Sequence, residues 1–161
     1  MKNLNGSESF KIIPYTLEIP TSTALEFIDI TDNIEILIKG TKISNGSVTV
    51  FSKHTTSAIV IQEDEPFLIQ DFKSFLENLA PAAGQYKHND FEHRTVHMHD
   101  DECPNGHSHC QQLLLGTSET IPIINGDMVL GKWQRIFMVE LDGLKAKQID
   151  FREIVVQIMG Q

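Results

Sequence analysis

The sequence predicts a single α+β domain (residues 1–161) in which helices pack on a largely antiparallel or mixed sheet. Its 161 residues are an ordinary length for one domain, and 40% of them are apolar, enough to fill a core. Two observations indicate the class. One segment in the middle of the chain has a clear helical repeat of apolar residues, and the last 45 residues divide into three strand-like runs.

The first element expected after a flexible N-terminus (residues 1–9) is a strand over residues 10–19. Pro14 interrupts this run, which is typical of an edge strand because proline donates no ladder hydrogen bond. Thr31 and Asp32 then stand as caps before the apolar residues of 34–38, which indicates a helix.

Two further strands are expected at residues 47–53 and 57–62, where apolar and polar side chains alternate. His54, Thr55 and Thr56 therefore lie between or within paired strands.

The helix with the clearest pattern follows residue 64. Asp64 is expected to cap it, Pro66 stands near its first position, and apolar residues recur at helical spacing from Leu68 to Leu79 before Pro81 stops the run. Residues 84–106 form a long polar loop of a length that usually marks function or disorder. A short helix is predicted from His107 to Leu115, ending before Gly116.

The C-terminal part predicts three strands, at residues 120–124, 128–141 and 148–159. Asn125-Gly126 and Asp142-Gly143 separate them, and both dipeptides favour tight hairpin turns. An antiparallel arrangement of these strands follows.

Histidine is concentrated in one stretch of the chain. Six of the seven histidines fall within 22 residues, and the two cysteines lie within or directly after this stretch: His88, His93, His97, His99, His107, His109, Cys103 and Cys110. Neutral imidazole binds Zn²⁺ and similar ions, so we expect at least one metal ligand here. The alternative is a solvated polar loop. His93, His97 and His99, which have acidic neighbours, are expected to be the surface members of the cluster.

The charge balance excludes some partners. Asp and Glu number 22 against 13 Lys and Arg, a net charge of −9, which disfavours nucleic acid or an anionic membrane as the main partner. No apolar run approaches the length of a membrane helix, and the N-terminus has no signal-peptide pattern. We therefore expect a cytoplasmic protein that acts on a small molecule.

Eight short segments, in chain order, together resemble the YjbQ-like family, also described as secondary thiamine-phosphate synthases. The similarity covers residues 10–160. The segments are 50–59 (VFSKHTTSAI), 62–66 (QEDEP), 79–81 (LAP), 86–89 (YKHN), 105–109 (NGHSH), 114–116 (LLG), 131–134 (GKWQ) and 140–143 (ELDG).

The resemblance implies a homotrimer with a histidine-lined site for a divalent metal. The metal ligands it implies are His54, His88 and His109, with His107 in reserve. It also implies an activity, in which an aminopyrimidine diphosphate is joined to a thiazole phosphate with loss of pyrophosphate. Three histidines favour Zn²⁺, whereas a diphosphate substrate would favour Mg²⁺.

Other positions match polar motif residues of the family. By resemblance, the catalytic candidates are Glu63, Asp64, Gln134, Glu140 and Asp142, and the ligand-binding candidates are Trp133 and Lys145. The chain departs from the family where Gly-Lys-Trp-Gln replaces Gly-Thr-Trp-Gln and where Leu144-Lys145 replaces Pro-Arg. A lysine offers a phosphate a point charge instead of the two-pronged contact of an arginine.

The residues leave two other functions open. One is a metal-dependent hydrolase of a small phosphorylated or acyl substrate, because a metal-bound water suits hydrolysis. The other is a non-catalytic trimer that binds a small anion. His54 could equally be a core histidine bonded to backbone, and Trp133 a core or interface residue.

Overall fold

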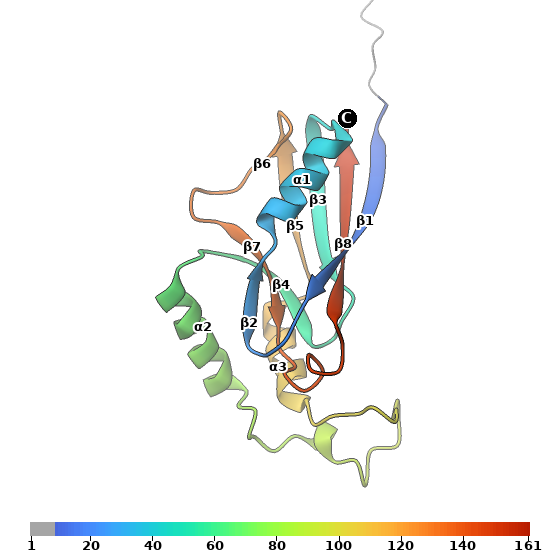
Figure 1. The fold of residues 1–161 in the computed structure, drawn as a ribbon, viewed down its shortest axis with the longest axis vertical. Helices are drawn as coiled ribbons and strands as arrows, with labels where there is room; N and C mark the ends of the chain where they lie inside the picture. The colour runs from blue at the N-terminus through green and yellow to red at the C-terminus, as the bar shows by residue number, and fades with distance from the viewer. Residues whose placement is uncertain (1–8) are drawn as a thin grey trace, which may run out of the picture.

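The computed structural model describes residues 9–161, which form two antiparallel sheets with helices packed on them (Figure 1). The α+β class is confirmed. In chain order the elements are β1 (Lys11–Pro20), β2 (Glu26–Asp29), α1 (Thr31–Thr41), β3 (Asn45–Ser52), β4 (Ser57–Gln62), α2 (Pro66–Leu79), the 3₁₀ turn η1 (Lys87–Asn89), α3 (Gly106–Leu115), β5 (Ser118–Ile124), β6 (Asp127–Met128), β7 (Arg135–Glu140) and β8 (Phe151–Gly160).

The larger sheet has the strand order β1-β8-β3-β5-β6, and every neighbouring pair is antiparallel. β1 lies at its edge, so the position predicted from Pro14 is confirmed. The predicted β5–β6 turn is also confirmed. Asn125 and Gly126 have φ of 54° and 81°, the two positive values that a type I′ hairpin requires.

The smaller sheet has the order β2-β7-β4, with β7 buried on both faces. Ile136 and Met138 point into the larger core, while Phe137 and Val139 point into a smaller one. The alternation of side chains along a strand produces this division. The smaller sheet therefore separates two hydrophobic cores.

Helix α1 covers the larger core, and α2 lies at the outer side of the smaller sheet (Figure 1). Ile34 and Ile38 of α1 are fully buried in the larger core. From α2, Leu76 is buried in the smaller core, and the ring of Phe72 lies 5.9 Å from that of Phe27. The rest of this amphipathic helix is more open to solvent.

Two predictions for the C-terminal part are wrong. Residues 128–141 do not form one strand, because they divide into β6 in the larger sheet and β7 in the smaller one. A turn separates these strands, and in it Gln134 Oε1 accepts the Gly131 N–H at 2.7 Å. β7 and β8 are not a hairpin, since they belong to different sheets. The side chain of Asp142 accepts the N–H groups of Leu144 and Lys145 and so shapes a crossover turn.

One predicted helix cap is also wrong, and one short strand was not predicted. The N-terminus of α2 is capped by Glu65, whose carboxylate accepts the N–H groups of Phe67 and Leu68, and not by Asp64. β2 is only four residues long and follows no repeat that the sequence makes visible. Within residues 9–161, no helix has the length and apolar character needed to cross a membrane.

Glycines 46 and 40 provide a matched test of this packing. A Cβ at Gly46 would overlap the carbonyl oxygen of Met159 and the Cα of Gly160 on the neighbouring strand, whereas a Cβ at Gly40 in α1 meets nothing within 4 Å. We expect Gly46→Ala to lower the free energy of unfolding by about 1–3 kcal/mol. Gly40→Ala should raise it by about 0.5–1 kcal/mol. Urea denaturation measures both, and equal effects would contradict the register of β3 against β8.

Candidate functional site

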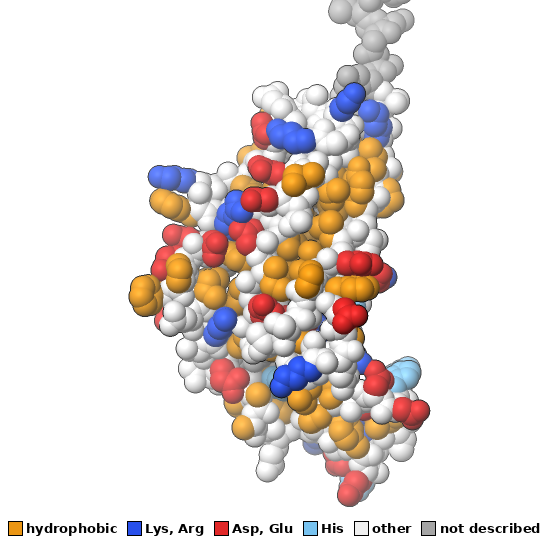
Figure 2. All heavy atoms as spheres, in the orientation of Figure 1, with side chains coloured by type: hydrophobic (Ala, Val, Ile, Leu, Met, Phe, Trp, Pro, Cys, Tyr) orange, Lys and Arg blue, Asp and Glu red, His pale blue; other side chains and the backbone are white. Residues whose placement is uncertain are grey.

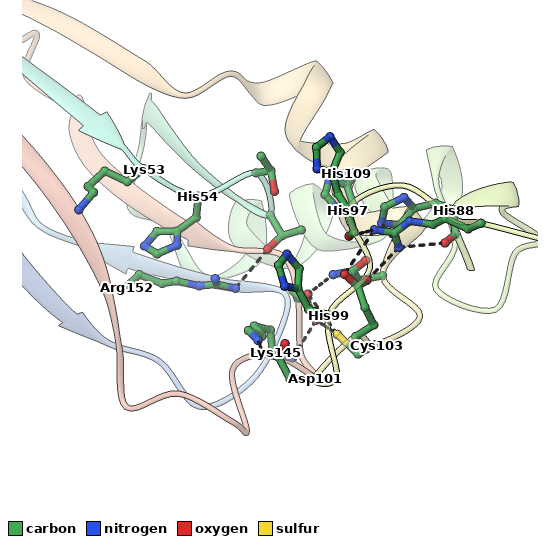
Figure 3. A pocket seen from close by; sticks show the side chains of 16 residues that line it. Lys53, His54, His88, His97, His99, Asp101, Cys103, His109, Lys145 and Arg152 are labelled. Carbon is green, nitrogen blue, oxygen red and sulfur yellow. Dashed lines mark hydrogen bonds and ion pairs between the residues drawn. The ribbon is translucent and has the colours of Figure 1, made fainter. Parts of the chain in front are cut away.

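One cavity of about 460 Å³ lies where segments far apart in the sequence meet (Figure 3). Its walls come from the connection between β3 and β4 (residues 53–56), from the loop and helix start of residues 88–109, from the turn of residues 142–145, and from Arg152 of β8. The volume suits a small molecule.

A buried ion pair lies at the base of this cavity. Arg152 donates from Nε to Glu140 Oε2 at 2.6 Å and from Nη2 to Glu140 Oε1 at 2.7 Å. Glu140 is fully buried and Arg152 is only 3% exposed. Because Glu140 ends β7 and Arg152 begins β8, the pair joins the two sheets.

The same pair fixes two parts of the cavity wall. Arg152 Nη2 also lies 3.3 Å from Thr56 Oγ1, and Glu140 Oε1 accepts the N–H of Asp142 at 3.0 Å. The connection between β3 and β4 and the turn after β7 are thus bonded to one buried centre.

His54 lies on one side of the cavity in a defined tautomer. Its Nε2 lies 3.0 Å from the backbone nitrogen of Glu153. A backbone amide can only donate, so Nε2 accepts and the proton of the neutral ring is on Nδ1. Burial lowers the pKa of His54, and the nearby positive charge of Arg152 lowers it further. While this hydrogen bond holds, Nε2 is not available to a metal.

His88 and His109 lie together on the opposite side (Figure 3). Their ring centroids are 4.5 Å apart in an edge-to-face arrangement. Burial lowers the pKa of His109, and the neighbouring His88 contributes in the same direction. Arg94 Nη1 lies 3.4 Å from His88 Nε2 and pairs at 2.8 Å with Glu102.

Each of the four cationic side chains that line the cavity is paired with a carboxylate. Arg94 pairs with Glu102 and Arg152 with Glu140, and Lys53 and Lys145 form ion pairs with Glu153 and Asp101. Positive charge at the wall is therefore largely balanced.

Asp142 organises the cavity edge. Besides the turn amides, its carboxylate accepts from Asn105 Nδ2 at 2.7 Å, and the Cys103 sulfur lies 3.7 Å away. Burial and the charge of Asp142 raise the pKa of Cys103 to about 11, so its thiol stays protonated at neutral pH. Asp142 thus links the turn to the residues that lead into α3.

The structure brings together some of the site residues predicted by resemblance and leaves others apart. His54, His88, His109, Asp142 and Lys145 line the cavity, and Glu140 lies directly behind Arg152. Outside the cavity lining are His107, Glu63, Asp64, Trp133 and Gln134.

The residues outside the lining have contacts of their own. Trp133 and Gln134 precede β7 at its far end, with Trp133 61% exposed and the Lys132 ammonium 4.4 Å from its ring. His107 Nε2 lies 3.2 Å from Ser108 Oγ, while its Nδ1 is buried without a partner among the described residues.

Two histidines expected only at the surface contribute to the site. His97 and His99 are exposed, but both line the mouth of the cavity. Of the three histidines expected at the surface, only His93 lies outside the lining, where it contacts Asp90.

Sequence reasoning did not find Arg152, Arg94 or Asn105. The sequence did contain a signal for Arg152. Its side chain points to the same face of β8 as those of Ile154, Val156 and Ile158, and a charged residue on that face must be buried.

The geometry fits a metal ion in part. Over residues 9–161, no group of three or more His, Cys, Asp or Glu side chains is arranged to hold one ion. His54 lies across the cavity from His88 and His109, and its Nε2 accepts the Glu153 N–H. The imidazole pair can supply at most two nitrogen donors, of which His88 Nε2 also lies 3.4 Å from Arg94 Nη1, and the remaining positions would fall to water, substrate or another side chain.

The chain matches known proteins over most of its length. The sequence profile described as "UPF0047 protein YjbQ-like" matches residues 15–161. A UPF0047 protein of Methanothermobacter thermautotrophicus is 42% identical over 137 residues, which cover 84% of this chain and 88% of that protein. The chain belongs to the YjbQ-like UPF0047 family. The resemblance found in the sequence is thereby confirmed.

Solved structures of UPF0047 relatives share the fold. A YbjQ-like protein of unknown function from Sulfolobus solfataricus superposes with a TM-score of 0.82 at 31% identity, covering 95% of this chain and all of that one. A yjbq/upf0047 family protein from Clostridium acetobutylicum gives 0.73 at 33% identity, covering 91% and 98%. These likenesses establish the family and the fold.

The neutral histidines predict how stability depends on pH. The unfolded chain takes up protons near pH 6.5, while folded His54 and His109 take them up only at lower pH. Their contribution is therefore complete above about pH 6.5 and is lost as the pH falls below it. We expect the midpoint temperature of thermal unfolding to decrease as the pH is lowered from 7.5 to 5.

The variant His54→Gln isolates one part of this dependence. Glutamine keeps an acceptor for the Glu153 N–H but does not titrate, so the midpoint should fall less steeply with acid than in the parent. The exposed His93→Gln serves as control. Identical pH profiles for His54→Gln and the parent would show that His54 is not held neutral.

Proposed function

We propose that this chain is an enzyme that acts on a small phosphorylated substrate with the help of a divalent metal ion. The thiamine-phosphate synthase reaction implied by the family resemblance is its first candidate activity. The observation that carries the proposal is one cavity of small-molecule size with two contacting imidazoles on one side and cationic donors on the other.

His88 and His109 are the residues that would hold the metal. Burial keeps His109 neutral, and a neutral ring is the form that binds a metal ion. Imidazole donors favour Zn²⁺ over Mg²⁺. Bound there, the ion would supply Lewis acidity toward a phosphate oxygen or a carbonyl. His54 would serve the substrate as a hydrogen-bond donor through Nδ1 and not as a ligand.

The protein's own part in a transferase reaction is to hold two substrates in line. Lys53, Lys145 and Arg152 would contact phosphate oxygens as the diphosphate departs from the aminopyrimidine methylene. Glu140 would act through Arg152 as a positioning residue, and Asp142 would position the backbone of Lys145.

Metal-dependent hydrolysis is the second candidate, and one observation favours it. Every cation of the cavity wall already faces a carboxylate, which reduces the net positive charge available to a diphosphate. A substrate with a single phosphate or acyl group needs less positive charge from the cavity wall than a diphosphate does. A non-catalytic anion-binding protein would have the cavity without turnover.

We also propose a cytoplasmic homotrimer. The observation that supports self-assembly is the uncovered apolar surface of α2, where Phe67, Phe75 and Leu79 are all more than half exposed; the number of subunits comes from the family resemblance and the location from the sequence. Figure 2 shows hydrophobic side chains emerging along the edge of the molecule where α2 lies. Exposed apolar patches of this kind mark interfaces between proteins.

The metal assignment is tested by the double variant His88→Ala/His109→Ala. We expect the purified parent to bind about one zinc per chain when zinc is supplied, and the double variant to bind almost none, because both imidazole donors are lost. Elemental analysis after gel filtration measures the ratio. His93→Ala, an exposed histidine of the same loop, is the control. Full zinc content in the double variant would rule out this pair as ligands.

The reaction is tested with the two thiamine precursors. We expect formation of thiamine phosphate and pyrophosphate by the parent and a fall in kcat/KM of at least ~100-fold in His88→Ala, since even the loss of an outer hydrogen-bond partner of a metal ligand costs 10–100-fold. Release of inorganic phosphate from the thiazole phosphate alone would favour the hydrolase. Equal rates in parent and variant would exclude a role for this site.

A further inference from the structure

Arg152 carries a donor that the fold does not use. Its Nε and Nη2 are bonded to Glu140 and Thr56, but Nη1 has no hydrogen-bond partner among residues 9–161. The side chain is only 4% exposed, and the cavity is the space it borders. Nη1 is not completely buried, so it remains open to the cavity.

A second unused donor lies beside it. His54 Nε2 is bonded to the Glu153 amide, which leaves the Nδ1 proton without a partner in the described part of the chain. Lys53 stands on the same side of the cavity, as Figure 3 shows for Lys53, His54 and Arg152. The carboxylates of this side are occupied, Glu140 by Arg152 and Glu153 by Lys53.

We propose that Arg152 is the specificity-determining residue for an oxyanion of the substrate, and that it binds a phosphate group through Nη1 with His54 Nδ1–H beside it. This inference rests on the proposed function, because it assigns the phosphate end of the same cavity, opposite His88 and His109. Arginine and phosphate match in charge and in geometry.

The surroundings prepare Arg152 for this role. The two-pronged bond to Glu140 holds the guanidinium in one orientation, so binding costs little additional ordering. A pair that served only to join the sheets would need no donor at a cavity wall, and burying an unsatisfied donor is unfavourable. Lys145, the other cation on the turn after β7, is paired with Asp101 and is therefore less available to an anion.

The test is a titration of inorganic phosphate into the full chain in EDTA, so that no metal contributes to binding. Arginine Nε NMR signals can be followed separately, because the chain's other arginines are Arg94 and Arg135 alone. We expect the Arg152 signal to shift with phosphate and the Arg135 signal to stay unchanged. Calorimetry should show phosphate binding weakened about tenfold or more in Arg152→Lys.

Arg135→Lys is the matched control. Arg135 also bridges carboxylates, those of Asp29 and Asp32, but lies at the other end of β7 and outside the cavity lining. Its variant should bind phosphate within about twofold of the parent, since only cavity donors contact the ligand. Should Arg152→Lys fail to fold, the NMR titration of the parent decides alone.

Three results would overturn the inference. They are an Arg152 signal that does not move at saturating phosphate, equal phosphate affinity in Arg152→Lys and the parent, and acetate binding as tightly as phosphate, which would make the site a carboxylate site. Phosphate binding at Arg152 without turnover of the thiamine precursors would contradict the thiamine-phosphate synthase reaction but support the anion site. A failure of the proposed function can therefore be distinguished from a failure of this inference.

Discussion

The buried pair of Glu140 and Arg152 is the interaction on which the site depends. Two charges removed from water are stable only when their geometry is good and their remaining donors and acceptors are satisfied. Here the bonds go to Thr56, to the Asp142 amide and, on our proposal, to a ligand. The pair also connects strands of different sheets, so a disturbance at the cavity base is transmitted to both cores.

The position of the cavity follows from the topology. β3 and β4 lie in different sheets, as do β7 and β8, and the connections within both pairs contribute residues to the cavity wall. Connections at such points leave regular hydrogen bonding, which frees side chains to face a ligand while rigid strands hold their ends. The long segment of residues 84–106 then closes the open side with His88, Arg94 and Asn105.

The sequence predicted local features well and long-range ones poorly. The repeat of α2, the edge position of β1 and the Asn125-Gly126 turn depend on neighbours in the chain, and all three are confirmed. The division of residues 128–141 between two sheets depends on tertiary packing, and no local pattern encodes it. Likewise the tautomer of His54 is set by an amide 99 residues away, and the density of histidines could not separate His97 and His99, which line the cavity, from His93.

The turn before β7 has a practical consequence for spectroscopy. Trp133 is the single tryptophan of the chain, it is largely exposed, and an ammonium group lies over its ring at the far end of β7 from Glu140. Its fluorescence therefore starts from a hydrated, water-like emission and will change little when a ligand enters the cavity or the cores melt. A blue shift in that emission would instead signal that another surface has covered the turn, which makes this side chain a native reporter of assembly.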